Sequence, residues 1–293
     1  MHIVLGATGH VGSAVVRALL SRNEPVTAVT RNAAHAQDLR MRGAEVAEVD
    51  ILDAEALRAV FRRGRRAFLL NPPADIATDT DAVERRSVSA ILAALEGSGL
   101  EKVVAESTYG AQPGHRNGDF GPLYALEQGL AAQSIPATIQ RAAYYMSNWD
   151  AQLDGVRESG KLQSFFPPDF ALPMVSPQDL GETAAGFMTE PADRNGVHYV
   201  EGPQRYRIAE VAEAISSVVG RAVEVDALPR SDWRRAYREL GFSEAAAESY
   251  ERMTAITLDA AELPDRPVRG RMTLQDYFRT QQSRDDAVSA GKV

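Results

Sequence analysis

Residues 6–12 form a glycine-rich stretch that constrains the fold of this chain more than any other part of it. They read Gly-Ala-Thr-Gly-His-Val-Gly, and they lie between the short apolar run 2–5 and the apolar-periodic run 15–20. That order predicts a strand, a tight turn and a helix. Because the first backbone N–H groups of a helix lack intrahelical acceptors, they can bind an anion such as a pyrophosphate.

The three glycines have separate steric roles. Gly6 permits the tight turn, Gly9 lets a phosphate approach where a Cβ would intrude, and Gly12 lets the helix pack closely on the strand. An ordinary glycine-rich turn is the alternative, but it leaves these three glycines unexplained. We therefore predict a dinucleotide site here, with cofactor contacts from Gly6, Thr8, Gly9, His10, Val11 and Gly12.

Composition limits the class of protein. The chain has 293 residues, of which 44% are hydrophobic, so we expect one large domain or two closely joined ones. A net charge of -8 and a pI near 5.3 argue against nucleic acid as the main partner. Since no apolar run is long enough to cross a membrane and no leader precedes the first strand, we expect a cytoplasmic protein without membrane contact.

Side chains suited to metal or amine chemistry are scarce. The chain has no cysteine, and its five histidines lack metal-ligand spacing, so we predict no metal site. Only three lysines occur, at Lys102, Lys161 and Lys292. Few residues are therefore available as a catalytic amine.

The second predicted strand, 26–30, ends at Arg31. An acidic residue at this place usually accepts hydrogen bonds from the adenosine ribose, whereas an arginine suits a 2′-phosphate. Arg31 therefore predicts NADP(H) in preference to NAD(H). The alternative is a solvated arginine at the start of a helix.

A third strand at 45–49 leads into Asp50 and Ile51. Asp50 would accept a hydrogen bond from the adenine amino group, and Ile51 would lie against the ring. Equally, Asp50 and Asp53 would serve only to cap the following helix.

Three further strands bring polar and aromatic residues to the carboxyl edge of the sheet, which is the ligand side of open parallel sheets. The strand at 67–70 leads to Asn71 and Pro72, that at 102–105 to Ser107 and Tyr109, and that at 137–140 to Tyr144 and Tyr145. We assign Asn71, Pro72, Ser107 and Tyr145 to the nicotinamide half of the cofactor. Tyr109 and Tyr144 are the candidate catalytic residues, as stacking surfaces or phenolic donors; a purely structural role is the alternative for each.

Six strands with helical crossovers predict an α/β protein with a Rossmann doubly wound parallel sheet. Beyond residue 146 the alternation breaks, which indicates a smaller, mostly helical α/β substrate domain. We assign 1–147 and 176–202 to the NAD(P)-binding domain, and 148–175 and 203–280 to the smaller one. The polar end, 281–293, is expected to be a disordered tail.

These motifs together resemble the NmrA-like atypical short-chain dehydrogenase/reductase family, and within it the NAD(P)H-dependent quinone oxidoreductases. The resemblance rests on the glycine stretch and on TRN at 30–32, VDILD at 49–53, the serine–tyrosine exit at 107–109, IPATIQRAAYYMSNW at 135–149, VSPQDLGETAA at 175–185 and GRAVEV at 220–225. It spans nearly the whole chain. One departure matters: related short-chain enzymes use Tyr-x-x-x-Lys, whereas here Tyr124 is followed by Gln128, which argues against an alcohol dehydrogenase mechanism.

The resemblance implies an NADPH-dependent oxidoreductase that passes a hydride to a quinone-like or other conjugated small molecule, a reaction that needs orientation more than a tuned acid. The alternative is an NADP(H)-binding redox sensor without turnover, which would use the same glycine stretch. A nucleotide-sugar epimerase is a third reading, against which the missing lysine argues. The chain is compatible with a homodimer, and its sequence names no acceptor.

Overall fold

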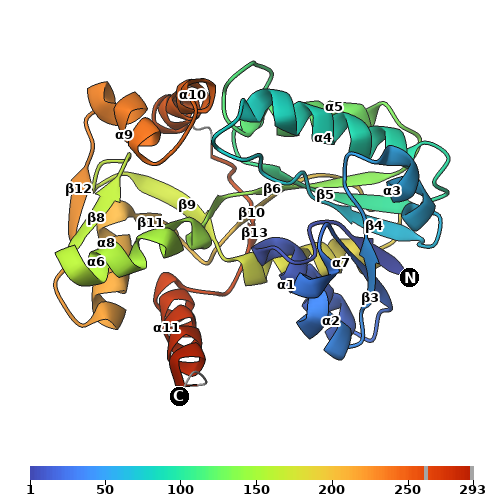
Figure 1. Ribbon diagram of the computed structural model, residues 1–293, viewed down its shortest axis with the longest axis horizontal. Helices are drawn as coiled ribbons and strands as arrows, with labels where there is room; N and C mark the ends of the chain where they lie inside the picture. Colours follow the sequence, from blue (N-terminus) through green and yellow to red (C-terminus); the bar gives the residue numbers. More distant parts are fainter. Residues whose placement is uncertain (261–262, 291–293) are drawn as a thin grey trace.

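The central element of the protein is a parallel sheet, seen in a computed structural model that describes residues 1–260 and 263–290 (Figure 1). Its eight strands follow the order β13-β10-β6-β5-β4-β1-β2-β3, and every pairing is parallel. The strands are β1 (His2–Val4), β2 (Val26–Thr30), β3 (Glu45–Glu48), β4 (Arg66–Leu69), β5 (Lys102–Thr108), β6 (Ala137–Ala142), β10 (Gly196–Glu201) and β13 (Val268–Arg269). The predicted Rossmann class is confirmed.

Helices cover both faces of this sheet, as Figure 1 shows. One face carries α1 (His10–Ser21), α2 (Gln37–Met41) and α7 (Pro177–Thr189), and the other carries α3 (Ala54–Phe61), α4 (Thr80–Leu95) and α5 (Phe120–Ala131). Because both faces are covered, the inner strands are buried along most of their length; all five residues of β2 are buried. Two separate hydrophobic clusters result, one under each layer of helices.

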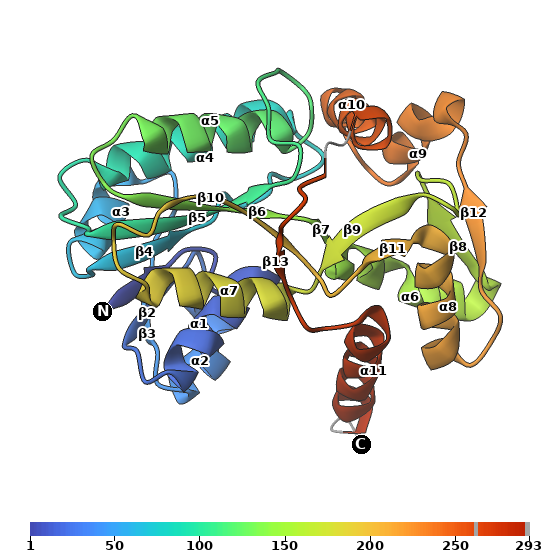
Figure 2. The ribbon, with the colours of Figure 1, turned by 180° about the vertical axis from the view of Figure 1, so that it is seen from behind.

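A second lobe lies beside the sheet (Figure 2). It contains a three-stranded sheet of β7 (Tyr144–Tyr145), β9 (Ala171–Val175) and β11 (Arg205–Arg207), and a two-stranded sheet of β8 (Lys161–Ser164) and β12 (Glu224–Ala227). Its helices are α6 (Leu153–Ser159), α8 (Ile208–Val219), α9 (Trp233–Glu239), α10 (Glu244–Ala260) and α11 (Leu274–Ala290). A third hydrophobic cluster, which includes Trp149, Tyr277 and Phe278, forms its core.

The chain leaves the main sheet and returns to it twice. As the sequence suggests for 176–202, α7 packs on α1 and β10 pairs with β6. A Cβ on Gly181 would lie 2.5 Å from backbone atoms of Ala14, so this glycine sets how closely the two helices approach. The eighth strand, β13, comes from residues assigned by sequence to the smaller domain. The domain boundaries remain a prediction.

Several local differences have clear physical causes. Helix α4 starts at Thr80, because the Asp79 carboxylate accepts a hydrogen bond from the Ala82 N–H at 3.2 Å and caps the helix. Helix α11 continues through Ala290, so 281–290 are helical where the sequence predicts a disordered tail; that stretch has no glycine or proline to stop a helix. Residues 291–293 of the predicted tail lie outside the described residues. Three short 3₁₀ turns, Ala33–Ala36, Met146–Gln152 and Arg230–Asp232, complete the described elements.

The described part of the chain has no helix that is both long enough and apolar enough to span a bilayer.

Gly12→Ala tests the packing of the glycine stretch. A Cβ at this position would lie 2.2 Å from the Gly6 carbonyl oxygen, so the helix and the turn must move apart. We expect the free energy of unfolding, measured with urea, to fall by about 1–3 kcal/mol. Gly155→Ala in α6 is the matched control, because its Cβ would meet nothing within 4 Å; it should leave stability unchanged or raise it slightly. Equal stability of the two variants would contradict this account.

Candidate cofactor site

The glycine stretch has the geometry of an anion-binding turn. Gly6 has a φ of +62°, and its carbonyl oxygen accepts a hydrogen bond from the Gly9 N–H at 2.9 Å. Gly9 is the N-cap of α1 and has no side chain to cover the helix end. Thr8, Gly9 and His10 are exposed to solvent, while Val11 and Gly12 are buried. The N-terminal end of α1 is therefore open to solvent, whereas Val11 and Gly12 pack against the protein.

The contacts separate the roles of the glycines. A Cβ on Gly9 would touch protein only at the Gly6 carbonyl oxygen, 3.4 Å away, so the fold itself has room for a side chain there. Because Gly9 has no side chain, the solvent side of the turn is open, as the approach of a phosphate requires. Gly12, by contrast, is required by the protein's own packing. Thr8 is linked to the end of β2, because its hydroxyl lies 3.3 Å from that of Thr30.

A cavity of about 480 Å³ lies at the carboxyl ends of β2, β3 and β4. It brings together four residues that the sequence assigned to the cofactor, Arg31, Asp50, Ile51 and Pro72. Sequence reasoning did not assign its other lining residues, which are Leu52, Pro73, Ala74, Asp75, Thr78, Val83 and Ser87. Val83 and Ser87 lie one turn apart on α4. The individual contacts stay predictions.

Two of the charged residues that line this cavity, Arg31 and Asp50, differ in their surroundings. Arg31 is exposed, and no ion pair to it occurs among the described side chains. Asp50 accepts a hydrogen bond from the Leu52 N–H at 3.0 Å, whereas Asp53, not Asp50, caps α3. A carboxylate accepts several hydrogen bonds, so Asp50 retains capacity for a ligand.

Asn71 follows β4, and its Oδ1 atom is buried without a hydrogen-bond partner in the described structure. Buried amide oxygens are normally paired. An unpaired oxygen at the ligand edge of the sheet fits a group that donates to it, such as a carboxamide. The residues present therefore fit a nicotinamide dinucleotide.

The Ser107 hydroxyl is hydrogen-bonded within the protein. Its hydroxyl donates to Glu127 Oε1 of α5 at 2.5 Å, and Arg141 binds the same carboxylate at 2.6 and 2.9 Å. Arg141 also donates to the Tyr199 hydroxyl at 2.9 Å. A contact of Ser107 with the cofactor remains a prediction, and its hydroxyl proton is directed to Glu127. Nothing in the sequence indicated Glu127.

The Tyr109 hydroxyl is also hydrogen-bonded within the protein. Its hydroxyl donates to Glu201 Oε1 at 3.0 Å. Glu201 is fully buried, accepts hydrogen bonds from Arg205 and forms an ion pair with Arg269 at 2.8 Å. Burial and the neighbouring Glu201 raise the pKa of Tyr109 well above its ordinary value. The phenol is therefore protonated at neutral pH, although its proton points at Glu201. Its catalytic role remains a prediction.

Tyr145 and Tyr144 lie on opposite faces of their short strand β7. The Tyr145 hydroxyl donates to Glu106 Oε1 at 2.9 Å, and Gln140 Nε2 donates to the other oxygen at 2.7 Å. Burial raises the pKa of Glu106 to about 8, against the effect of both hydrogen bonds. Tyr144 packs in the second lobe against Trp149 and Phe166, and burial raises its pKa to about 12.

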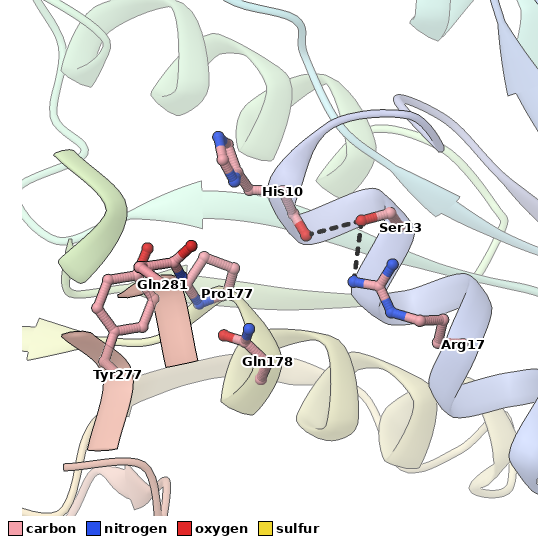
Figure 3. A pocket seen from close by; sticks show the side chains of 7 residues that line it. All are labelled: His10, Ser13, Arg17, Pro177, Gln178, Tyr277 and Gln281. Carbon is pink, nitrogen blue, oxygen red and sulfur yellow. Dashed lines mark hydrogen bonds between the residues drawn. The ribbon is translucent and has the colours of Figure 1, made fainter. Parts of the chain in front are cut away.

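A second, smaller cavity of about 150 Å³ lies between α1, α7 and α11 (Figure 3). Along α1 the Ser13 hydroxyl donates to the His10 carbonyl at 3.2 Å and accepts from Arg17 Nη2 at 3.1 Å. The start of α7 supplies Pro177 and Gln178, and α11 supplies Tyr277 and Gln281. Helix α11 therefore lines a cavity together with α1, the helix that begins within the glycine stretch. No pattern in the sequence predicted this arrangement.

With this geometry established, the relatives of the chain can be considered. The model of the NmrA-like family matches residues 2–273. The chain belongs to this family. The expected family membership is confirmed, and the match includes the glycine stretch, both lobes and the last strand, β13.

Among NmrA-like proteins, the chain is similar to an NAD(P)H azoreductase of Xenophilus azovorans, with 27% identity over 258 residues, 87% of each chain. It is 23% identical to quinone oxidoreductase 2 of Escherichia coli over 85% of each chain. A solved structure of Citrobacter sp. triphenylmethane reductase complexed with NADP(H) superposes with a TM-score of 0.79 at 21% identity, covering 96% of this chain and 99% of that one. Because the identity is 21%, this likeness shows the fold alone.

Glu106→Gln tests the buried carboxyl beside Tyr145. Because its pKa rises from 4.5 to about 8 on folding, the folded state binds the proton more tightly, and stability declines as pH rises from 4.5 to 8. For this one group the decline is about 1.4 kcal/mol per pH unit within that window. We expect urea unfolding at pH 6 and pH 7.5 to show a shallower decline in the variant. Glu55→Gln, with a side chain 82% exposed, should keep the wild-type slope; an unchanged slope in Glu106→Gln would refute the assignment.

Proposed function

We propose that this protein is an NADPH-dependent oxidoreductase that reduces a quinone-like or other conjugated small molecule. The observation that carries the proposal is that an outward-facing glycine turn and a cavity lined by Arg31 and Asp50 lie at the same carboxyl edge of the sheet. Related proteins named as NAD(P)H azoreductase and quinone oxidoreductase support the reaction class.

Preference for NADP(H) over NAD(H) forms part of the proposal. Arg31 is exposed at the cavity and has no carboxylate partner among the described residues, so its guanidinium is available to a 2′-phosphate. Asp50 and Ile51 would bind the adenine, and Asn71 the nicotinamide half. The amides of 9–12 would bind the pyrophosphate.

When bound, the nicotinamide supplies a hydride. The chain's own contribution is then to orient the acceptor beside the sheet edge and to exclude water. Orientation alone contributes a large share of the rate in such transfers. Tyr144, protonated at neutral pH and surrounded by aromatic rings, would offer a stacking surface or a proton to the reduced acceptor.

The contacts argue against chemistry of the alcohol dehydrogenase type. Such an enzyme needs a hydroxyl group that is free to exchange a proton with the substrate oxygen, and in related short-chain enzymes this is a tyrosine activated by lysine. Here the Ser107 hydroxyl donates to Glu127, and Gln128 takes the lysine position. A conjugated acceptor has no such requirement. A redox sensor without turnover is the second candidate, and the same glycine turn would serve it.

Turnover distinguishes the two candidates. We expect purified protein mixed with NADPH to oxidise it in the presence of at least one member of a quinone and azo-dye panel, followed at the absorbance of the reduced nicotinamide. Tyr144→Phe, which keeps the ring and removes the hydroxyl, should lower kcat if the phenol supplies a proton, whereas Tyr144→Ala should lower it in either role. Tight NADPH binding without oxidation across the panel would favour the sensor.

Arg31→Glu tests the cofactor preference. An arginine bonded to a phosphate contributes about 1.5–3 kcal/mol, so the Kd of NADPH should rise about tenfold to a hundredfold. The Kd of NADH, measured by the same fluorescence titration, should change little. Arg40→Glu on α2 makes the same charge change outside the cavity and is the control. Undiminished preference for NADPH in Arg31→Glu would rule out this role.

A further inference from the structure

Glu84 is a buried carboxyl group directly behind the wall of the large cavity. It lies on α4 between Val83 and Ser87, which line the cavity, and its side chain is held inside, with the residue only 3% exposed. Its Oε1 atom accepts a hydrogen bond from the Ala74 N–H at 3.2 Å. Ala74 belongs to the segment 72–75, every residue of which lines the cavity. Glu84 therefore joins this segment to α4.

The surroundings of Glu84 are acidic rather than basic. Its own helix presents Asp81, which Arg85 binds through two hydrogen bonds at 2.9 and 3.1 Å. The start of α5 presents Asp119, and α10 presents Tyr250, whose hydroxyl donates to Asp119 Oδ1 at 3.2 Å. The nearby Arg116 is bound between Asp79 and Glu248. Among the described side chains no cation pairs with Glu84.

We propose that Glu84 is a positioning residue that holds the segment 72–75 in the shape required by the adenine half of the cofactor, and that loss of its proton loosens this wall. The inference rests on the proposed function, since it takes the cavity to hold that half. In its neutral form the carboxyl group accepts from Ala74 without placing a charge in the interior.

The physical cause is the cost of an unpaired buried charge. Burial, together with the charge of Asp119, raises the pKa of Glu84 to about 8, and these effects outweigh the hydrogen bond from Ala74, which favours the ionised form. Above this pH the ionised group lies near Asp119 without a cation, and the available relief is access to water. Water reaches it when the segment 72–75 moves away from α4, which opens the cavity. A cofactor that contacts the segment 72–75 in its observed position opposes this movement, so NADPH should bind less tightly at high pH.

The test is the Kd of NADPH between pH 7 and pH 9.5, measured by fluorescence titration without an acceptor. For the wild type we expect the Kd to rise about threefold to tenfold over this range. Glu84→Gln keeps an oxygen that accepts from Ala74 and cannot ionise, so its Kd should equal that of the wild type at pH 7 and stay level. Glu84→Ala loses the hydrogen bond, and its Kd should be raised about fivefold at both pH values.

Two controls separate this role from a structural one. Glu55→Gln on α3 should reproduce the wild-type pH dependence, and a melting temperature for each variant shows whether affinity changes without unfolding. A wild-type Kd that is independent of pH, or the same pH dependence in Glu84→Gln, would overturn the positioning role alone. Absence of NADPH binding at every pH would overturn the proposed function as well.

Discussion

The contact on which the site depends is that between the Gly12 backbone in α1 and the Gly6 carbonyl group. A single added carbon atom would lie 2.2 Å from that oxygen, so the helix begins directly against the turn that follows β1. This close approach leaves Thr8, Gly9 and His10 at the surface and points the first turn of α1 outward. It also fixes α1 against the sheet, where α7 packs on it through Gly181.

The parallel sheet then determines where the remaining chemistry gathers. Since all eight strands of the main sheet run in one direction, the residues at their carboxyl ends meet at one edge, although they are far apart in the chain. Arg31, Asp50 and Pro72 come from three different crossovers and line one cavity. The second lobe lies beside this edge, so the adenine end and the acceptor end of the proposed cofactor site are built by different parts of the protein.

Buried carboxyl groups support this edge from behind, and they do so in two ways. Glu127 and Glu201 are bound by arginines and accept hydrogen bonds from Ser107 and Tyr109. Glu106 and Glu84 have no described cation, and burial raises the pKa of each to about 8. All four groups accept hydrogen bonds in this region, from the hydroxyls of Ser107, Tyr109 and Tyr145 and from the N–H of Ala74. The two without a cation bear the full cost of burying a charge when they ionise.

The sequence alone determined the fold class and the residues at the strand ends, because glycine turns, β-branched runs and helix caps are local signals that short-range sterics and hydrogen bonds decide. The tertiary structure decided which hydroxyls are free. Ser107 lies within β5, which runs further than the sequence predicts, and Tyr109 directly follows that strand. Their hydroxyls donate to Glu127 and Glu201, 20 and 92 residues away. It likewise placed Glu84 behind the large cavity, and it placed α1 and α11 on two sides of the smaller one. Such contacts depend on which side chains meet across packed elements, and a periodic pattern shows which face of an element is buried but not what lies opposite it.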